Sequence, residues 1–280
     1  MDLLSFGKII SDEIITIQFL ESKRTRKIIC PFCKSKKIYT MKSKMRFRCK
    51  MCKKDFRPFG DSKFQLVKIS YSKWLALIKL FELSVSAKVA SEQTQTSYKT
   101  ALKAFDVIRF SILEELAKTD DVLRGEIEAD EAYFGGKRKG NRGRGAKNKT
   151  IVFGILERKG KVSVDIVNNV SAKTLLASTV KKVKKGSIVY TDKWRGYNSL
   201  MFSGYNHLSV DHNTRFANGK VYINGIEGFW SFAKERMAKH HGISSSKFLL
   251  YIKEMEWRYN NRASNLFDLV VNYMLGAGYP

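Results

Sequence analysis

The sequence lacks the marks of a membrane or secreted protein. Its 280 residues contain no run of about 18 consecutive apolar residues, which a membrane-spanning helix would need. The first 20 residues carry acidic side chains and lack the basic segment and apolar run of a signal peptide. We therefore expect a cytoplasmic protein that has no membrane partner.

Acidic residues are scarce relative to basic ones. The chain has 26 Asp and Glu against 52 Lys and Arg, which gives a formal net charge of +26. A chain this basic usually binds a polyanion, most often a nucleic acid. An anionic membrane surface is the competing partner, but no long basic amphipathic helix stands apart from a core. Charge alone therefore indicates DNA or RNA binding and says nothing about catalysis.

Cysteine occurs only four times, at Cys30, Cys33, Cys49 and Cys52. Two CxxC pairs separated by fifteen residues favour a metal over disulfides in a cytoplasmic chain. Two such knuckles make the tetrahedral sulfur cage that Zn²⁺ prefers, and a cage of protein ligands alone is structural. We predict a zinc ribbon over residues 23–60, with a hairpin between the knuckles, after a leader over residues 1–22. The alternative is four unrelated cysteines.

Residues 72–118 show helical periodicity. An amphipathic helix over 71–83 precedes a short helix over 85–93, a turn over 94–96 and a long helix that starts at Ser97. Two helices joined by a three-residue turn are typical of a helix-turn-helix. Its second helix opens with Ser97, Tyr98 and Lys99, which could face a major groove. The alternative is a helical bundle that packs between domains.

Residues 124–274 are predicted to form an α/β domain. Three consecutive strands precede a helix, a strand, another strand and a final helix. The expected elements are strands over 125–134, 149–159, 161–170, 187–194 and 207–212, and helices over 171–186 and from 224 onward. This is the order of a ribonuclease-H-like fold. The predicted architecture is therefore α/β, with a ribonuclease-H-like catalytic domain behind an N-terminal zinc ribbon and a helix-turn-helix segment.

Three acids fall at places that converge in such a fold. Asp130 lies on the first strand, Asp192 ends the fourth strand and Glu227 lies on the following helix. Clustered carboxylates repel one another unless a cation joins them, and oxygen ligands suit two Mg²⁺ or Mn²⁺ ions that act on a phosphodiester. By alternation Glu131 points to the opposite face from Asp130, whereas Glu128 shares Asp130's face and is a lesser candidate.

Four blocks of the sequence resemble a known family. They are DEAYFGGK (130–137), YTDKWRGY (190–197), NGIEGFWSFAKER (224–236) and YIKEMEWRYNNR (251–262). Together with the CxxC pairs they resemble bacterial insertion-sequence transposases of the ISXO-like type, which are relatives of the eukaryotic Merlin transposases. The resemblance spans residues from about 25 to 262.

The resemblance implies a DDE transposase. Its triad would be Asp130, Asp192 and Glu227, and Lys234, seven residues after the glutamate and about two helical turns away, would hold a phosphate. The partners would be double-stranded DNA, both the terminal inverted repeats and the target. Synapsis of two ends implies a homodimer or a larger assembly, in the bacterial cytoplasm and at the nucleoid when bound.

Several positions carry local predictions. The basic segment after Gly135 contains Lys137, Arg138, Arg142 and Arg144, which we expect near DNA; a solvated flexible loop is the alternative. Trp230 is predicted to be structural. Trp194 and Tyr197 are predicted to pack beneath Asp192; stacking on a flipped base is the alternative.

Two other functions stay open at this point. One is a zinc-ribbon regulator, descended from a transposase, that binds DNA without cutting it. The other is a ribonuclease-H-like nuclease that cuts structured DNA without joining strands.

Overall fold

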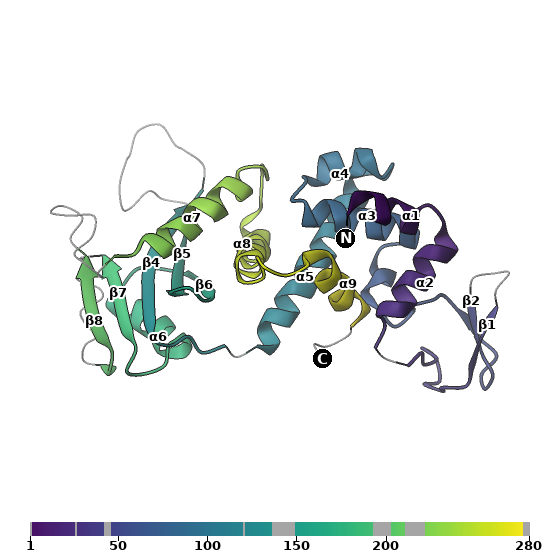
Figure 1. The fold of residues 1–280 in the computed structure, drawn as a ribbon, viewed down its shortest axis with the longest axis horizontal. Coiled ribbons are helices and arrows are strands. Elements are labelled where there is room, and N and C mark those ends of the chain that lie inside the picture. The colour runs from purple at the N-terminus through teal and green to yellow at the C-terminus, as the bar shows by residue number, and fades with distance from the viewer. Residues whose placement is uncertain are drawn as a thin grey trace. The chain divides into compact units, whose positions relative to one another are not determined.

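The computed structural model describes residues 2–25, 27–41, 46–119, 121–135, 149–192, 203–210 and 222–276. The chain divides into two compact units, one formed by Met1–Leu116 with Ala263–Pro280 and the other by Ala117–Arg262. Figure 1 shows the course of the chain through both units. No helix among the described residues is both long and apolar enough to cross a membrane.

The first unit opens with two helices where the sequence suggested a single leader helix. They are α1 (Leu3–Ile10) and α2 (Glu13–Lys23). The break falls at Asp12, whose carboxylate accepts the backbone N–H of Ile14 at 2.7 Å and so starts a new helix. The first residue of α2, Glu13, also accepts the backbone N–H groups of Tyr71 and Ser72. The leader is therefore part of the folded unit.

The cysteine-rich segment folds as a three-stranded antiparallel sheet. Its strands are β1 (Ile38–Met41), β2 (Arg46–Cys49) and β3 (Asp55–Phe56), in the order β1-β2-β3. Its core is small: Phe47 and Phe56 pack beside the buried Cys30 and Cys49. So little buried apolar area cannot stabilise a sheet alone, which is the situation in which a structural metal is needed.

Helices make up the rest of the first unit. They are the 3₁₀ helix η2 (Lys63–Leu66), α3 (Tyr71–Glu82), α4 (Ala87–Gln93), α5 (Tyr98–Lys118) and α9 (Leu266–Leu275). The sequence analysis placed residues up to 274 in the catalytic domain, but the structure groups α9 with the first unit. The reason is local packing. Phe267 meets Phe6 with ring centroids 5.6 Å apart, and Asp268 pairs with Lys23 at 2.9 Å.

The second unit contains a five-stranded sheet in the order β6-β5-β4-β7-β8. The β6–β5 and β5–β4 pairs are antiparallel, whereas the β4–β7 and β7–β8 pairs are parallel. The strands are β4 (Glu126–Phe134), β5 (Thr150–Glu157), β6 (Val162–Val167), β7 (Ile188–Asp192) and β8 (Asn206–Val210). Three antiparallel strands followed by two parallel ones confirm the ribonuclease-H-like fold.

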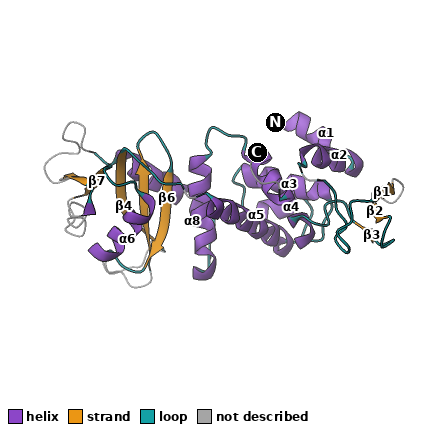
Figure 2. Ribbon diagram, turned by 90° about the horizontal axis from the view of Figure 1, so that it is seen from below, coloured by secondary structure: helices purple, strands orange, loops and turns teal. Residues whose placement is uncertain are grey.

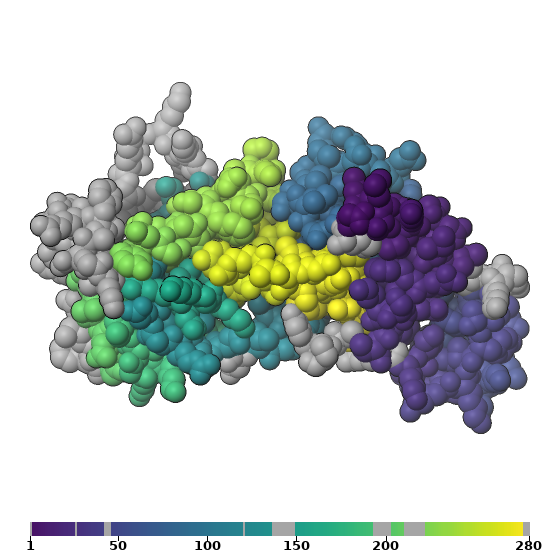
Figure 3. Space-filling view, in the orientation of Figure 1, coloured from purple at the N-terminus to yellow at the C-terminus, as the bar shows by residue number. Residues whose placement is uncertain are grey.

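Helices cover both faces of this sheet. On one face α6 (Ala172–Lys182), capped by Ser171, packs its Leu175 with Ile127 and Ala129. On the other face lies α7 (Asn224–Met237), which Figure 3 shows as a light-green ridge over the strands. Because side chains alternate along β4, Ile127 and Ala129 face α6. Glu128, which lies between them, and Asp130, which follows them, face α7.

The last helix of the second unit, α8 (Ser245–Asn260), covers an edge of the sheet. Figure 2 shows it standing alongside β6. Asn260 bonds both the N–H and the C=O of Val162, each at 2.8 Å, and Glu256 accepts the N–H of Val164 at 3.0 Å. Side chains of α8 thus take the place of a neighbouring strand and protect an edge that could otherwise pair with another chain.

Candidate active site and zinc centre

Asp130 and Asp192 lie on adjacent parallel strands. The β4–β7 register pairs Glu126 with Ile188 and Glu128 with Tyr190. Continued by two residues, the same offset places Asp130 beside Asp192, on the face of the sheet that α7 covers. The two carboxylates also interact electrostatically. Two of the three predicted acids therefore come together.

The surroundings of Asp130 disfavour its negative charge. Burial, and then the charges of Glu131 and Asp192, raise the pKa of Asp130 from 3.8 to about 7. One of its oxygens, Oδ2, accepts a hydrogen bond from the Trp230 indole N–H at 3.1 Å. Trp230, predicted to be structural, is buried in the core and also contacts this acid. Glu131 belongs to the opposite face, because its cross-strand partner Phe153 packs in the α6 cluster.

Glu227 and Lys234 lie on the exposed side of α7. Glu227 is in the first turn of the helix, one turn before Trp230, and Lys234 follows two turns later. Among the described residues, the four cysteines are the only group of three or more His, Cys, Asp or Glu side chains gathered closely enough to share a metal ion. Glu227 therefore lies one helical turn before the tryptophan that contacts Asp130, and the structure does not gather the three acids around one point.

The donor set fits a divalent cation. All three groups are carboxylates, and hard oxygen ligands are those that Mg²⁺ and Mn²⁺ prefer. Burial, and after it the charges of Glu131 and Asp192, leave the Asp130 carboxylate in need of a positive charge to balance it. A divalent ion would supply that balance, and Asp130, Asp192 and Glu227 are the residues that would hold it.

Gly154 makes room for the contact between Trp230 and Asp130. It lies on β5 directly opposite Asp130. A Cβ atom at this position would come within 2.5 Å of Trp230 Cζ2 and within 3.0 Å of Ile226 Cδ1. The tryptophan ring lies flat on the strand only because residue 154 has no side chain. A lone glycine inside a strand is the sequence signal that could have indicated this close approach.

We predict that Gly154→Ala destabilises the protein by about 1–3 kcal/mol, because the added methyl group overpacks a filled core and moves Trp230 away from Asp130. Thermal unfolding and tryptophan fluorescence measure both effects. Gly228→Ala on α7 is the matched control, since nothing lies within 4 Å of its Cβ position. In a helix this change should be neutral or stabilising by up to about 1 kcal/mol. Equal effects of the two substitutions would contradict the assignment.

The raised pKa of Asp130 predicts a pH effect on metal-free protein. The folded state keeps a proton that the unfolded state releases above about pH 4, so this group's contribution to stability falls as the pH rises from about 4 to about 7. Thermal unfolding in EDTA at pH 5 and pH 8 measures the loss. Asp130→Asn should remove this part of the pH dependence, and a saturating divalent cation should reverse its sign. An unchanged pH dependence in Asp130→Asn would refute the prediction.

Glu128, the lesser candidate on the same face, is already engaged within the protein. Its side chain is 1% exposed, and Oε1 accepts the Arg158 Nε–H at 3.0 Å. Oε2 accepts the backbone N–H of Ile226 at 2.9 Å. Both oxygens therefore have partners other than Asp130 and Asp192. Glu128 and Arg158 are structural partners that the sequence analysis missed, because Arg158 is 30 residues and Ile226 is 98 residues away along the chain.

The four cysteines form a cage of the size that zinc requires. Their sulfur atoms all lie within 4.8 Å of one another, with Cys30–Cys52 at 3.6 Å and Cys33–Cys49 at 3.5 Å. Tetrahedral zinc with sulfur ligands at about 2.3 Å separates them by about 3.8 Å. Hydrogen bonding from the backbone of Cys52 lowers the pKa of Cys49 to about 6, which favours the thiolate that binds zinc. This set of residues therefore fits a structural zinc ion.

The two knuckles have the same backbone geometry. In the first, the Lys34 N–H donates to the Cys30 carbonyl at 2.9 Å; in the second, the Lys53 N–H donates to the Cys49 carbonyl at 3.0 Å. Lys34 and Lys53 both adopt the left-handed conformation, with φ of 60° and 59°. Each lysine directly follows the second cysteine of its pair, so both turns direct their sulfur atoms to one point.

The residues of the predicted helix-turn-helix that could face DNA lie at the start of α5. Ser97, Tyr98 and Lys99 are all exposed, and the Tyr98 side chain is 53% exposed. The Ser97 hydroxyl accepts the Thr100 N–H at 3.1 Å and so caps the helix. Because the Ser97 hydroxyl is used in this cap, Tyr98 and Lys99 are better placed than Ser97 to contact a ligand. Lys137, Arg138, Arg142, Arg144, Trp194 and Tyr197 lie outside the described residues.

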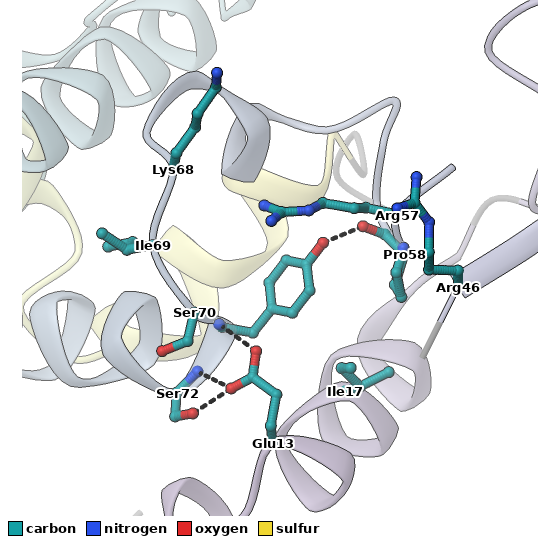
Figure 4. Close-up of a pocket in the computed structure, with 10 residues that line it drawn as sticks. Glu13, Ile17, Arg46, Arg57, Pro58, Lys68, Ile69, Ser70 and Ser72 are labelled. Atoms are coloured by element: carbon teal, nitrogen blue, oxygen red, sulfur yellow. Dashed lines mark hydrogen bonds between the residues drawn. The ribbon is translucent and has the colours of Figure 1, made fainter. Parts of the chain in front are cut away.

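A basic groove of about 690 Å³ lies between the cysteine-rich segment, with its three-stranded sheet, and the start of α3. We call it the ribbon groove, and its cations are Arg46, Arg57 and Lys68, all of them exposed. Figure 4 shows Glu13 turned toward the first residues of α3, on the other side of the groove from Arg46 and Arg57. The Glu13 carboxylate accepts the backbone N–H groups of Tyr71 and Ser72 and forms no ion pair with these described cations.

Two comparisons of the sequence place the chain among transposases. Residues 122–260 match the ISXO2-like transposase domain. Over 103 residues the chain is 48% identical to an uncharacterized transposase-like protein of Haemophilus influenzae, in a match that covers 37% of this chain and 84% of that protein.

Solved structures show a weaker likeness. The catalytic core domain of HTLV-2 integrase in complex with magnesium has a TM-score of 0.32 at 13% identity, covering 50% of this chain and 87% of that chain. The Mos1 strand transfer complex has a TM-score of 0.32 at 12% identity, covering 72% of this chain and 76% of that chain. Because these TM-scores are low, the fold is assigned from the strand order of the sheet and not from these structures.

Proposed function

The chain belongs to the ISXO2-like transposase family, and we propose that it is a DDE transposase that cuts and joins DNA strands with Asp130, Asp192 and Glu227 as metal ligands. The observation that supports this most is the position of Asp130, in the middle of β4, where the parallel register brings it beside Asp192 at the end of β7. When bound, divalent ions at this place activate an oxygen nucleophile and stabilise the leaving oxygen of a phosphodiester.

The protein's own residues have separate tasks in this proposal. Asp130 and Asp192 supply the rigid part of the site, because both are held in the sheet. Glu227 supplies a third carboxylate from α7, and Lys234, two turns further on, binds a phosphate of the DNA. The Trp230 N–H holds one oxygen of Asp130 and leaves the other to the metal. The reaction would leave a 3′-hydroxyl that attacks a target strand, without a covalent protein–DNA intermediate.

The first unit would bind the terminal inverted repeats. The zinc centre fixes the basic ribbon, and Tyr98 and Lys99 at the start of α5 would enter a major groove. The basic segment from 137 to 144 would approach the DNA backbone. A pair of ends must be held together for transposition, so the working assembly would be a homodimer or larger.

The direct test uses labelled duplexes that carry the ends flanking the protein's own gene, incubated with Mg²⁺ or with EDTA. We expect Mg²⁺-dependent nicking at the ends that leaves an extendable 3′-hydroxyl. Tight binding without nicking would instead indicate a DNA-binding regulator. Nicking of branched DNA irrespective of end sequence would indicate a nuclease.

We predict that the ribbon groove contacts the DNA backbone. Arg57→Gln should then weaken binding to the end sequence and to an unrelated duplex alike, and lower the slope of log K against log salt concentration by about 1, the effect of losing one phosphate contact. Fluorescence anisotropy over a salt series measures both. Lys8→Gln on α1 is the matched control, since Lys8 is exposed and does not line the groove. An unchanged salt slope in Arg57→Gln would rule out the contact.

A further inference from the structure

The start of α7 lacks a local cap. Its N-cap residue, Ile223, makes no side-chain capping bond, although the first N–H groups of a helix need partners from outside the helix. The partner comes from β4, where Glu128 Oε2 accepts the Ile226 N–H at 2.9 Å. Gly225 permits this approach, because a Cβ there would come within 2.8 Å of the same oxygen.

Arg158 fixes both sides of this contact. Its Nε–H donates to Glu128 Oε1 at 3.0 Å, and its Nη2–H donates to the Tyr222 carbonyl, just before α7, at 2.7 Å. The guanidinium group also lies between two aromatic rings, 3.8 Å from the Tyr190 centroid and 3.9 Å from the Tyr222 centroid. Only a planar group with a fork of donors can make all of these contacts at once.

These contacts hold α7 at two points that bracket Glu227. The first is the Glu128–Ile226 bond, one residue before Glu227. The second is the Trp230–Asp130 bond, one turn after it. Both anchors belong to β4, which also carries Asp130. The arrangement therefore fixes the first turn of α7, which carries Glu227, relative to the strand that carries Asp130.

We propose that Arg158 and Glu128 are positioning residues for the metal site, which act by holding the first turn of α7 and thereby the Glu227 carboxylate. The inference rests on the proposed function, because it assumes that Glu227 is a metal ligand. Neither Arg158 nor Glu128 touches the metal or the DNA. Their contribution is the orientation of a ligand, and loss of such supporting contacts typically weakens metal affinity about 10- to 100-fold.

The test is Mn²⁺ binding by the full-length, zinc-loaded protein, followed by calorimetry and by electron paramagnetic resonance. We expect Arg158→Gln to weaken Mn²⁺ binding about 10- to 100-fold and to leave duplex binding unchanged. Gly225→Ala perturbs the same contact from the side of α7 and should weaken Mn²⁺ binding in the same direction. Arg262→Gln is the matched control, because Arg262 also stacks on a tyrosine, Tyr259, at 4.6 Å, but its hydrogen bonds go to the carbonyls of Tyr259 and Gly160 and not to the first turn of α7.

A double-mutant cycle separates positioning from general destabilisation. If Arg158 acts through Glu227, then Arg158→Gln has no further effect on Mn²⁺ binding in a Glu227→Gln protein. An equal loss in both backgrounds, or wild-type Mn²⁺ affinity in Arg158→Gln and Gly225→Ala, overturns the inference while the proposed function stands. Failure of the wild-type protein to bind Mn²⁺, or of Glu227→Gln to weaken it, overturns the proposed function and the inference with it.

Discussion

Asp192→Asn is expected to lower metal-dependent strand cleavage on the order of 10³-fold or more, which corresponds to at least about 4 kcal/mol of transition-state stabilisation. The substitution keeps the size of the side chain and removes the negative charge that would bind a divalent cation. It also removes a charge that raises the pKa of Asp130, so the folded protein should not be destabilised. Single-turnover cleavage of the end duplex measures the rate, and anisotropy measures duplex binding, which should not change.

The control for this experiment is a surface acid of the same unit. Asp121 pairs with Lys161 at 2.7 Å, and both side chains are about half exposed. An exposed ion pair of this kind contributes about 0–1 kcal/mol, so Asp121→Asn should leave cleavage and stability close to wild type. Cleavage by Asp192→Asn at the wild-type rate in Mg²⁺ would remove this residue from the active site.

Cys49→Ser is expected to abolish stoichiometric zinc binding and to unfold the ribbon. A structural zinc site contributes about 10–16 kcal/mol, which exceeds the net stability of about 5–15 kcal/mol of a typical folded protein. The four aromatic and aliphatic side chains that pack beside the cysteines cannot replace it; they are Phe47, Phe56, Ile28 and Ile38. Because the ribbon groove depends on the same fold, affinity for the end duplex should fall with the loss of zinc.

Metal analysis and the spectrum of the cobalt-substituted protein measure this effect, since four thiolates around Co²⁺ give strong charge-transfer bands. Met51→Ser is the matched control. Met51 lies between Cys49 and Cys52, and its side chain is 61% exposed, so the substitution alters the knuckle surface and keeps all four ligands. Retention of one zinc ion by Cys49→Ser, together with wild-type DNA binding, would contradict a structural role for the ion.

The sequence was informative where a pattern is local. Alternation along residues 126–134 was enough to assign Asp130 and Glu131 to opposite faces of the sheet, which the packing of α6 and α7 bears out. The order of strands and helices along the chain followed from the apolar patterns of successive segments, whereas their order in the sheet came only with the structure. The cysteine spacing indicated a closed cage, and the sulfur atoms do lie close together.

The contacts that shape the site could not be predicted in the same way. Arg158 meets Glu128 and Tyr222 across 30 and 64 residues, and Trp230 meets Asp130 across 100. No local periodicity encodes such pairs, because they arise only when the sheet and α7 pack together. The same reason explains α9: helix was expected from residue 224 onward, but the sequence could not show that Phe267 packs in the first unit.

Strand transfer tests the central claim most directly. Pre-nicked duplexes that carry the protein's own ends and a 3′-hydroxyl would be mixed with supercoiled target DNA in Mg²⁺, with wild-type protein or with Glu227→Gln. The account predicts end–target joined products with wild-type protein, lost in EDTA and reduced on the order of 10³-fold in Glu227→Gln. Tight binding of the ends by wild-type protein with no joined product in Mg²⁺ or Mn²⁺ would contradict it.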